Sequence, residues 1–165
     1  MSGTRIATTV LAVACVALTA VACGSPGPTA SPSTTSTPVA ASLPADRPPD
    51  AALLVPDGEP VVGQLGGYVW RDAGSDAPWL PGTAVTVSPT RPLVFALSVD
   101  TPVEGWTARY APPGNAFPTG PVPLAAGSTP LEIVPPPSGT WTVALRVTFG
   151  DGLGDAAYYW RVRVE

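Results

Sequence analysis

The sequence predicts an all-β fold, a two-sheet sandwich of about seven to nine short strands over residues 51–165. Three observations predict this fold. From Ala51 onward apolar residues recur at every second position, which is the period of a strand with one buried face. Gly, Pro and Asp separate these segments at roughly the 8–12 residue spacing typical of sandwiches. No amphipathic helix follows the first 22 residues.

The last two segments, Trp141–Phe149 and Ala156–Glu165, are the clearest strands. Their inward faces carry large apolar side chains: Trp141, Val143, Leu145, Val147, Phe149, Tyr158, Trp160, Val162 and Val164. Their outward faces carry smaller or polar ones: Thr142, Ala144, Arg146, Thr148, Tyr159, Arg161 and Arg163. The Gly- and Asp-rich loop 150–155 joins the two segments, so we expect a hairpin.

A symmetric hairpin sets Leu145 opposite Trp160 and Val143 opposite Val162, with both apolar faces on the same side. Trp70, with Tyr68, is also predicted to lie in the core. Six earlier segments are predicted strands: Val61–Leu65, Gly67–Arg71, Thr83–Ser88, Leu93–Val99, Gly105–Tyr110 and Pro130–Val134.

The segment PSGTWTV at 137–143 is similar to the G-T-Y-x-V pattern that begins a late strand in immunoglobulin-like and fibronectin-like domains. Trp141 stands where those domains often carry Tyr, and this chain lacks their usual core disulfide. The resemblance implies an immunoglobulin-like or fibronectin-like sandwich.

Residues 1–22 read as a secretory signal peptide, with Arg5 before the uncharged run Ile6–Ala22. The sequence Ala20-Val21-Ala22-Cys23 resembles the lipobox of bacterial lipoproteins. That resemblance implies cleavage just before Cys23 and a diacylglyceryl thioether on its sulfur. A similar motif ends at Cys15, but cleavage there would leave an apolar segment at the new N-terminus. The whole chain is similar to uncharacterised lipoproteins with immunoglobulin-like domains from high-GC Gram-positive bacteria.

Residues 23–50 form a predicted lipid-anchored linker. Positions 24–50 contain 7 Pro and 9 Ser or Thr among 27 residues, and almost no large apolar side chains. Such a segment buries too little surface to offset its ordering entropy, so we expect a disordered, extended spacer. These features place the protein on the extracytoplasmic face of the cell membrane. The Ser, Thr and Pro content of this spacer is also compatible with O-linked glycans.

The composition excludes several kinds of chemistry. The chain has no His, and its two cysteines, Cys15 and Cys23, both precede the domain. A Ser-His-Asp or Cys-His nucleophile and an ordinary zinc site are therefore ruled out. The acidic pairs of the domain, such as Asp151 and Asp155, lie in turns where Asp is usual. We expect no catalytic residue, cofactor or metal, and the net charge of −4 argues against nucleic acid.

Binding is the remaining class of function, and the sequence contains two candidate binding sites. Arg146, Tyr159, Arg161 and Arg163 share the outward face of the predicted hairpin, where Arg beside an aromatic ring suits a phosphate, a carboxylate or a sugar. The alternative is a solvated face whose arginines prevent edge pairing. Trp79, in a loop, is a second candidate, and its alternative role is to cap one end of the core.

We therefore expect a non-enzymatic binding or scaffolding module of the cell envelope, attached to the membrane through Cys23. Another envelope protein or a cell-wall glycan is the expected partner. The first alternative is a cell-wall glycan-binding accessory protein, which exposed coplanar aromatic rings near Trp79 or Trp106 would favour. A flat apolar patch would favour a protein partner. A small carboxylate-based hydrolase is a distant third, and it needs two facing carboxylates in a cleft.

Overall fold

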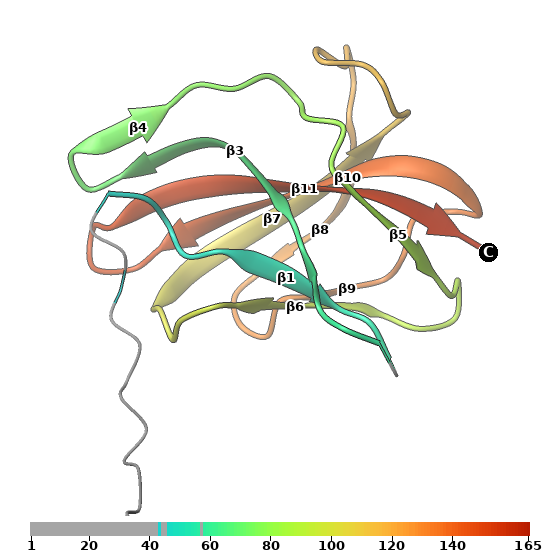
Figure 1. The fold of residues 1–165 in the computed structure, drawn as a ribbon, viewed down its shortest axis with the longest axis horizontal. Helices are drawn as coiled ribbons and strands as arrows, with labels where there is room; N and C mark the ends of the chain where they lie inside the picture. The colour runs from blue at the N-terminus through green and yellow to red at the C-terminus, as the bar shows by residue number, and fades with distance from the viewer. Residues whose placement is uncertain (1–42, 44–45, 57) are drawn as a thin grey trace, which may run out of the picture. The chain divides into compact units, whose positions relative to one another are not determined.

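The computed structural model describes residues 43, 46–56 and 58–165. These residues form eleven strands in two sheets and no helix, which confirms the predicted all-β sandwich (Figure 1). The chain divides into two units, Met1–Pro38 and Val39–Glu165, and all described residues belong to the second. The predicted signal peptide, Cys23 and most of the predicted linker lie outside the described residues.

The two sheets differ in size. The smaller sheet has the order β2-β1-β6-β9 and comprises β1 (Ala51–Leu54), β2 (Val61–Val62), β6 (Leu93–Leu97) and β9 (Glu132–Ile133). The larger has the order β4-β3-β11-β10-β7-β8 and comprises β3 (Gln64–Trp70), β4 (Ala73–Ser75), β7 (Val103–Ala111), β8 (Val122–Gly127), β10 (Gly139–Phe149) and β11 (Gly154–Val164). β5 (Thr83–Val87) pairs with the second half of β11, in the one parallel pairing among the described strands.

The number of strands exceeds the predicted seven to nine for a simple reason. The sequence predicts segments that include β2 and β9, but none at β1, β4 or β8. β4 has only three residues, too few to show an alternating pattern. β1 has the sequence AALL and β8 the sequence VPLAAG, and neither alternates between apolar and polar residues. Their strand conformation therefore depends on pairing with β6 and β7, which a single sequence does not reveal.

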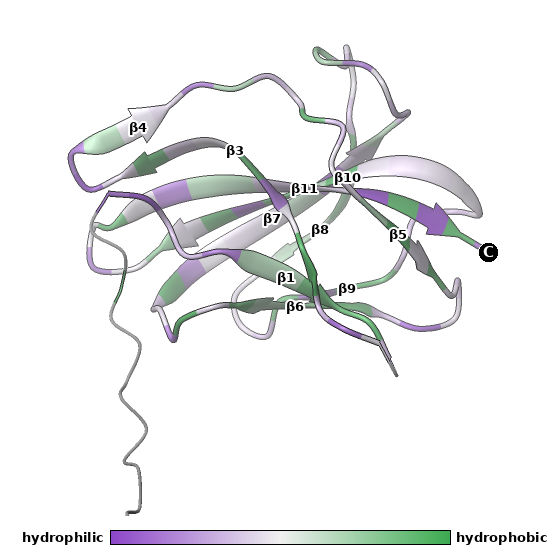
Figure 2. Ribbon diagram, in the orientation of Figure 1, coloured by the Kyte–Doolittle hydropathy of each residue, from purple (hydrophilic) through white to green (hydrophobic). Residues whose placement is uncertain are grey.

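The β10–β11 hairpin is confirmed, but the predicted register was wrong by two residues. Val143 lies opposite Trp160 and Leu145 opposite Tyr158. β11 begins at Gly154, inside the predicted loop, because a four-residue turn with positive φ at Asp151 and Gly152 already reverses the chain. A shift of two residues leaves every side chain on its predicted face, and the end of β11 alternates in hydropathy as expected (Figure 2).

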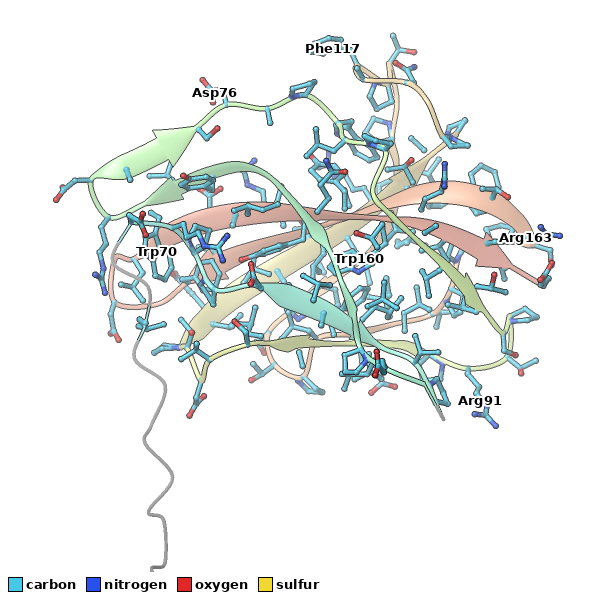
Figure 3. All side chains as sticks on the ribbon, viewed as in Figure 1. Trp70, Asp76, Arg91, Phe117, Trp160 and Arg163 are labelled. Atoms are coloured by element: carbon cyan, nitrogen blue, oxygen red, sulfur yellow. The ribbon has the colours of Figure 1, made fainter. Side chains whose placement is uncertain are left out.

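Trp160 is the central side chain of the core and has no exposed surface. Its ring packs against Phe95 of β6 with the ring centroids 4.9 Å apart. Its indole N–H donates a 2.8 Å hydrogen bond to the carbonyl oxygen of Val61 in β2. Trp160 thus links the larger sheet to two strands of the smaller one, and Figure 3 shows it in the middle of the sandwich.

The other predicted core aromatics are buried to different degrees. Trp70 is fully buried and packs edge-on against Phe149, as expected of a core residue. Tyr68 is half-buried and packs against the same core. Trp141 is also only half-buried, because it lies near the start of β10. Its ring packs against that of Tyr110, with the ring centroids 5.0 Å apart.

The packed structure begins before Ala51. Pro48 and Pro49 are both buried, and the Tyr158 hydroxyl donates a 2.6 Å hydrogen bond to the carbonyl oxygen of Pro49. Burial, with a smaller contribution from Asp50, raises the pKa of Tyr158, so its hydroxyl stays protonated and keeps this bond at physiological pH. The last residues of the predicted linker are therefore part of the domain.

The central position of Trp160 predicts a large effect of its removal. Trp160→Ala should lower the free energy of unfolding by about 3–5 kcal/mol, because it leaves a cavity between the sheets. The matched control, Arg161→Ala on the outward face, should change it by less than about 0.5 kcal/mol. Thermal or denaturant unfolding of the two variants side by side measures the difference, and equal destabilisation would contradict the assigned faces of β11.

Candidate functional site

The outer face of the larger sheet carries most of the predicted binding residues. Three neighbouring strands, β7, β10 and β11, supply two adjacent rows of side chains there, each running across the strands. By the strand register, one row consists of Arg109, Ala144 and Tyr159, and the next consists of Thr107, Arg146 and Ala157. These positions alternate with buried core residues such as Ala108 and Leu145, so they face away from the core.

These two rows form a hollow of about 230 Å³, which we call the arginine pocket. Its lining comprises Thr107, Arg109, Ala144, Arg146, Ala157 and Tyr159 of the three strands, and Trp79 and Pro121 of two loops. Ala144 and Ala157 are both buried and their side chains end at Cβ. The longer side chains of Arg109, Arg146 and Tyr159 therefore surround a depression above these two alanines. Small residues at these two positions therefore leave room for a ligand.

Tyr159 corrects one expectation, because its side chain is covered rather than solvated. Only 5% of the residue is exposed. Its ring lies against Gly66 of β3 on one side, where a Cβ atom would overlap it, and against Trp79 on another, with centroids 5.6 Å apart and planes at 63°. Burial raises the pKa of Tyr159 against the opposing effect of Arg146, so the hydroxyl is protonated at neutral pH.

Trp79 covers the outer face of the larger sheet and does not cap the end of the core. With Leu80 it packs onto a small apolar cluster formed by Ala144, Ala157 and Tyr159. Its backbone N–H donates a 2.9 Å hydrogen bond to the carbonyl oxygen of Ala116, which joins the β4–β5 and β7–β8 connections. Figure 1 shows these two connections meeting above the larger sheet.

The two arginines of the pocket have different surroundings. Arg146 forms an ion pair with Asp155, whose buried Oδ1 lies 2.5 Å from Nη2 and has no hydrogen-bond partner with good geometry. Arg109 is exposed and forms no ion pair within the described part of the chain. Sequence reasoning missed Arg109. The alternation with Trp106 and Ala108 does indicate an outward position, but only the pairing of β7 with β10 brings it beside Arg146.

Arg161 and Arg163 lie farther along β11 and belong to a second hollow of about 550 Å³. This hollow is also lined by Ala84, Val85, Thr86, Pro113 and Thr140. The Nε atom of Arg163 forms a 2.6 Å ion pair with Glu165, at the C-terminal end of the sheet (Figure 3). The structure therefore divides the five predicted binding residues into two groups on one sheet face.

Other predicted site features can be placed directly. Trp106 is buried and its indole N–H donates a 2.5 Å hydrogen bond to the carbonyl oxygen of Ser128, so it forms no exposed platform. Over residues 43, 46–56 and 58–165, no cluster of three or more acidic side chains could hold a metal ion. The same residues contain no helix of the length and hydropathy needed to cross a bilayer.

No protein-family model, curated protein or solved structure matches the chain.

The position of Gly66 predicts how the pocket responds to a single added methyl group. Gly66→Ala should lower the free energy of unfolding by about 1–3 kcal/mol, because the new Cβ overlaps the Tyr159 ring. Gly120→Ala is the matched control, since nothing lies within 4 Å of a Cβ there. Denaturant unfolding checks both. In a Tyr159→Ala background the Gly66 effect should largely disappear, and a full effect in that background would contradict the contact.

Proposed function

We propose that this protein is a non-enzymatic binding module of the cell envelope and that the arginine pocket is its ligand site. The observation that carries the proposal is the convergence of Arg109, Arg146 and Tyr159 on a small hollow built from three adjacent strands. Side chains on neighbouring strands of one sheet are held at fixed separations, which favours a specific ligand. An immunoglobulin-like sandwich is the domain type we propose for this scaffold.

The chemistry of the pocket supports binding rather than catalysis. Its polar groups are two guanidinium groups, the Tyr159 hydroxyl and the Thr107 hydroxyl, which offer hydrogen-bond donors but no base near neutral pH. A glycosidase needs two carboxylates about 5–10 Å apart across a cleft. Five hollows lie on the described part of the chain, and none of these five is lined by more than one carboxylate. The hydrolase alternative thus gains no support from these hollows.

We further propose that lipid on Cys23 holds the protein at the outer surface of the membrane. The 27 residues at 24–50 would reach up to roughly 80 Å if fully extended in a polyproline-like conformation. Pro48 and Pro49 belong to the domain, so the working spacer is slightly shorter. A spacer of this length lets the arginine pocket meet envelope components that are not embedded in the bilayer.

A protein partner is favoured by a separate observation on the smaller sheet. Leu54 is 41% exposed and Val62 is 51% exposed. Both lie on the outer face of this sheet, because Val62 pairs with Ala52 and Leu54 follows two residues later on the same strand. An apolar patch on a sheet face marks protein contacts when it is large and contiguous, so scaffolding through this face is the second candidate function.

The lipid anchor predicts the behaviour of a single variant. Cys23→Ala should leave the protein as an unprocessed precursor or release it from the membrane, since the thiol that would carry the diacylglyceryl group is gone. Membrane fractionation and metabolic labelling with a fatty acid measure this, with Cys15→Ala as the matched control. A Cys23→Ala protein that is still processed, labelled and membrane-bound would contradict the anchor.

Site-specific photo-cross-linking in living cells tests the proposed function. A photoreactive residue at Thr107 should capture an envelope component, because Thr107 lines the arginine pocket. The same residue at Glu132, an exposed position on β9 of the smaller sheet, reports the second candidate surface. Arg109→Gln should strongly reduce capture at Thr107 without changing capture at Glu132. Capture at Glu132 alone would reject the arginine pocket and favour scaffolding through the smaller sheet.

A further inference from the structure

The outer face of the larger sheet is cationic within an acidic domain. The described residues contain seven arginines and eleven acidic residues. Four of the seven arginines lie on this one face: Arg109, Arg146, Arg161 and Arg163. Their ion-pair partners are Asp155 for Arg146 and Glu165 for Arg163, so Arg109 and Arg161 have none among the described residues. Charge complementarity favours an anionic ligand at such a face.

The arginine pocket suits an anion with two or more acceptor oxygens. Arg109 lies opposite Ala144 and Arg146 lies opposite Thr107, so the two arginines are diagonal neighbours across β7 and β10. Diagonal neighbours are about 7–8 Å apart, close enough for two long side chains to contact one ligand group. Each guanidinium group carries five N–H donors in a planar arrangement. Asp155 contacts only Nη2 of Arg146, so the other donors of that guanidinium group are left for a ligand. Guanidinium groups bind carboxylate and phosphate in this bidentate manner.

The remaining lining suits a sugar ring. Trp79 supplies an aromatic wall, and Ala144 and Ala157 supply an apolar floor, while the ring of Tyr159 is covered by Gly66 and Trp79. Aromatic side chains with a polar tip present an apolar face together with a hydrogen-bonding group, and the Tyr159 hydroxyl has no protein partner within the described structure. The volume of about 230 Å³ is below the roughly 300–1,000 Å³ of pockets that enclose drug-sized ligands. A single ring fits these dimensions better than an extended cofactor.

We infer that the arginine pocket binds an acidic sugar, a ring that carries a carboxylate or a phosphate, as a unit of an envelope glycan. Arg109 and Arg146 hold the anionic group, Trp79 contacts the ring, and the Tyr159 hydroxyl offers it a hydrogen bond. Arg161 lies two residues beyond Tyr159 on the same face of β11, about 7 Å away by strand rise. The second hollow therefore offers a further anionic subsite to a polymer with repeated charges. This inference rests on the proposed function and names its ligand class.

Matched pairs of sugars test the ligand class directly. The full-length protein, purified in non-ionic detergent, is titrated calorimetrically with galacturonate oligomers and with their methyl esters, which keep the ring and lose the charge. Glucose 6-phosphate and glucose form the corresponding phosphate pair, and inorganic phosphate represents an anion without a ring. At least one acidic sugar should bind about tenfold or more tightly than its neutral counterpart, because hydrogen bonds to charged groups are the strong ones.

Four variants assign the binding to the pocket. Arg109→Gln and Arg146→Gln should each weaken binding of the acidic sugar about tenfold or more. Arg91→Gln removes an exposed arginine elsewhere in the domain and should leave the affinity unchanged, as a matched charge control (Figure 3). Trp79→Ala should weaken the acidic sugar but not inorganic phosphate. Thermal unfolding of each variant confirms that the fold is retained.

The outcomes separate the ligand class from the proposed function. Equal affinity for the acid and its neutral counterpart, no binding of any acidic sugar, or binding that Arg109→Gln leaves intact would each overturn the inference. Binding of inorganic phosphate with the same affinity as the acidic sugars, unchanged by Trp79→Ala, would overturn the sugar assignment. If the acidic sugars fail while capture at Thr107 in cells persists, the binding function stands with another ligand. If both fail, both proposals are rejected.

Discussion

The position of Trp160 between the two sheets is the constraint on which the rest of the structure depends. The ring is fixed by Phe95 and by the hydrogen bond to Val61, and Gly63 is the close neighbour that leaves space for it. Tyr159 precedes Trp160 on the same strand and must therefore point to the opposite face. The contact that joins the two sheets thus also determines where the tyrosine of the arginine pocket lies.

The pocket itself is made possible by small residues as much as by charged ones. Gly66 lets the Tyr159 ring lie close to β3, and Ala144 and Ala157 leave the centre of the hollow low. The covering loop with Trp79 then excludes water from one side of the tyrosine. Both guanidinium groups of the pocket are solvent-exposed, and Arg109, which has no ion pair in the described chain, is the one most available to an anion.

The sequence predicts features that depend on period two and misses those that depend on distant pairing. The hairpin strands and the faces of Trp160 and Arg161 follow from alternation alone. The register of the β10–β11 hairpin does not follow from alternation, because Gly154 belongs to β11 rather than to the turn. The burial of Tyr159 could not be predicted, since Trp79 reaches it from a loop about 80 residues earlier with no periodic pattern. The role of Arg109 required the knowledge that β7 pairs with β10.

Nuclear magnetic resonance of the arginine side chains tests the central claim most directly. The chain has eight basic residues, all of them arginine, so the Nε–Hε signals of a labelled sample form a small and assignable set. On titration with the acidic sugar that binds, the signals of Arg109 and Arg146 should shift most, and those of Arg71 and Arg91 should not move. Saturable binding that leaves the Arg109 and Arg146 signals unchanged, or that shifts all arginines equally, would contradict a specific arginine pocket.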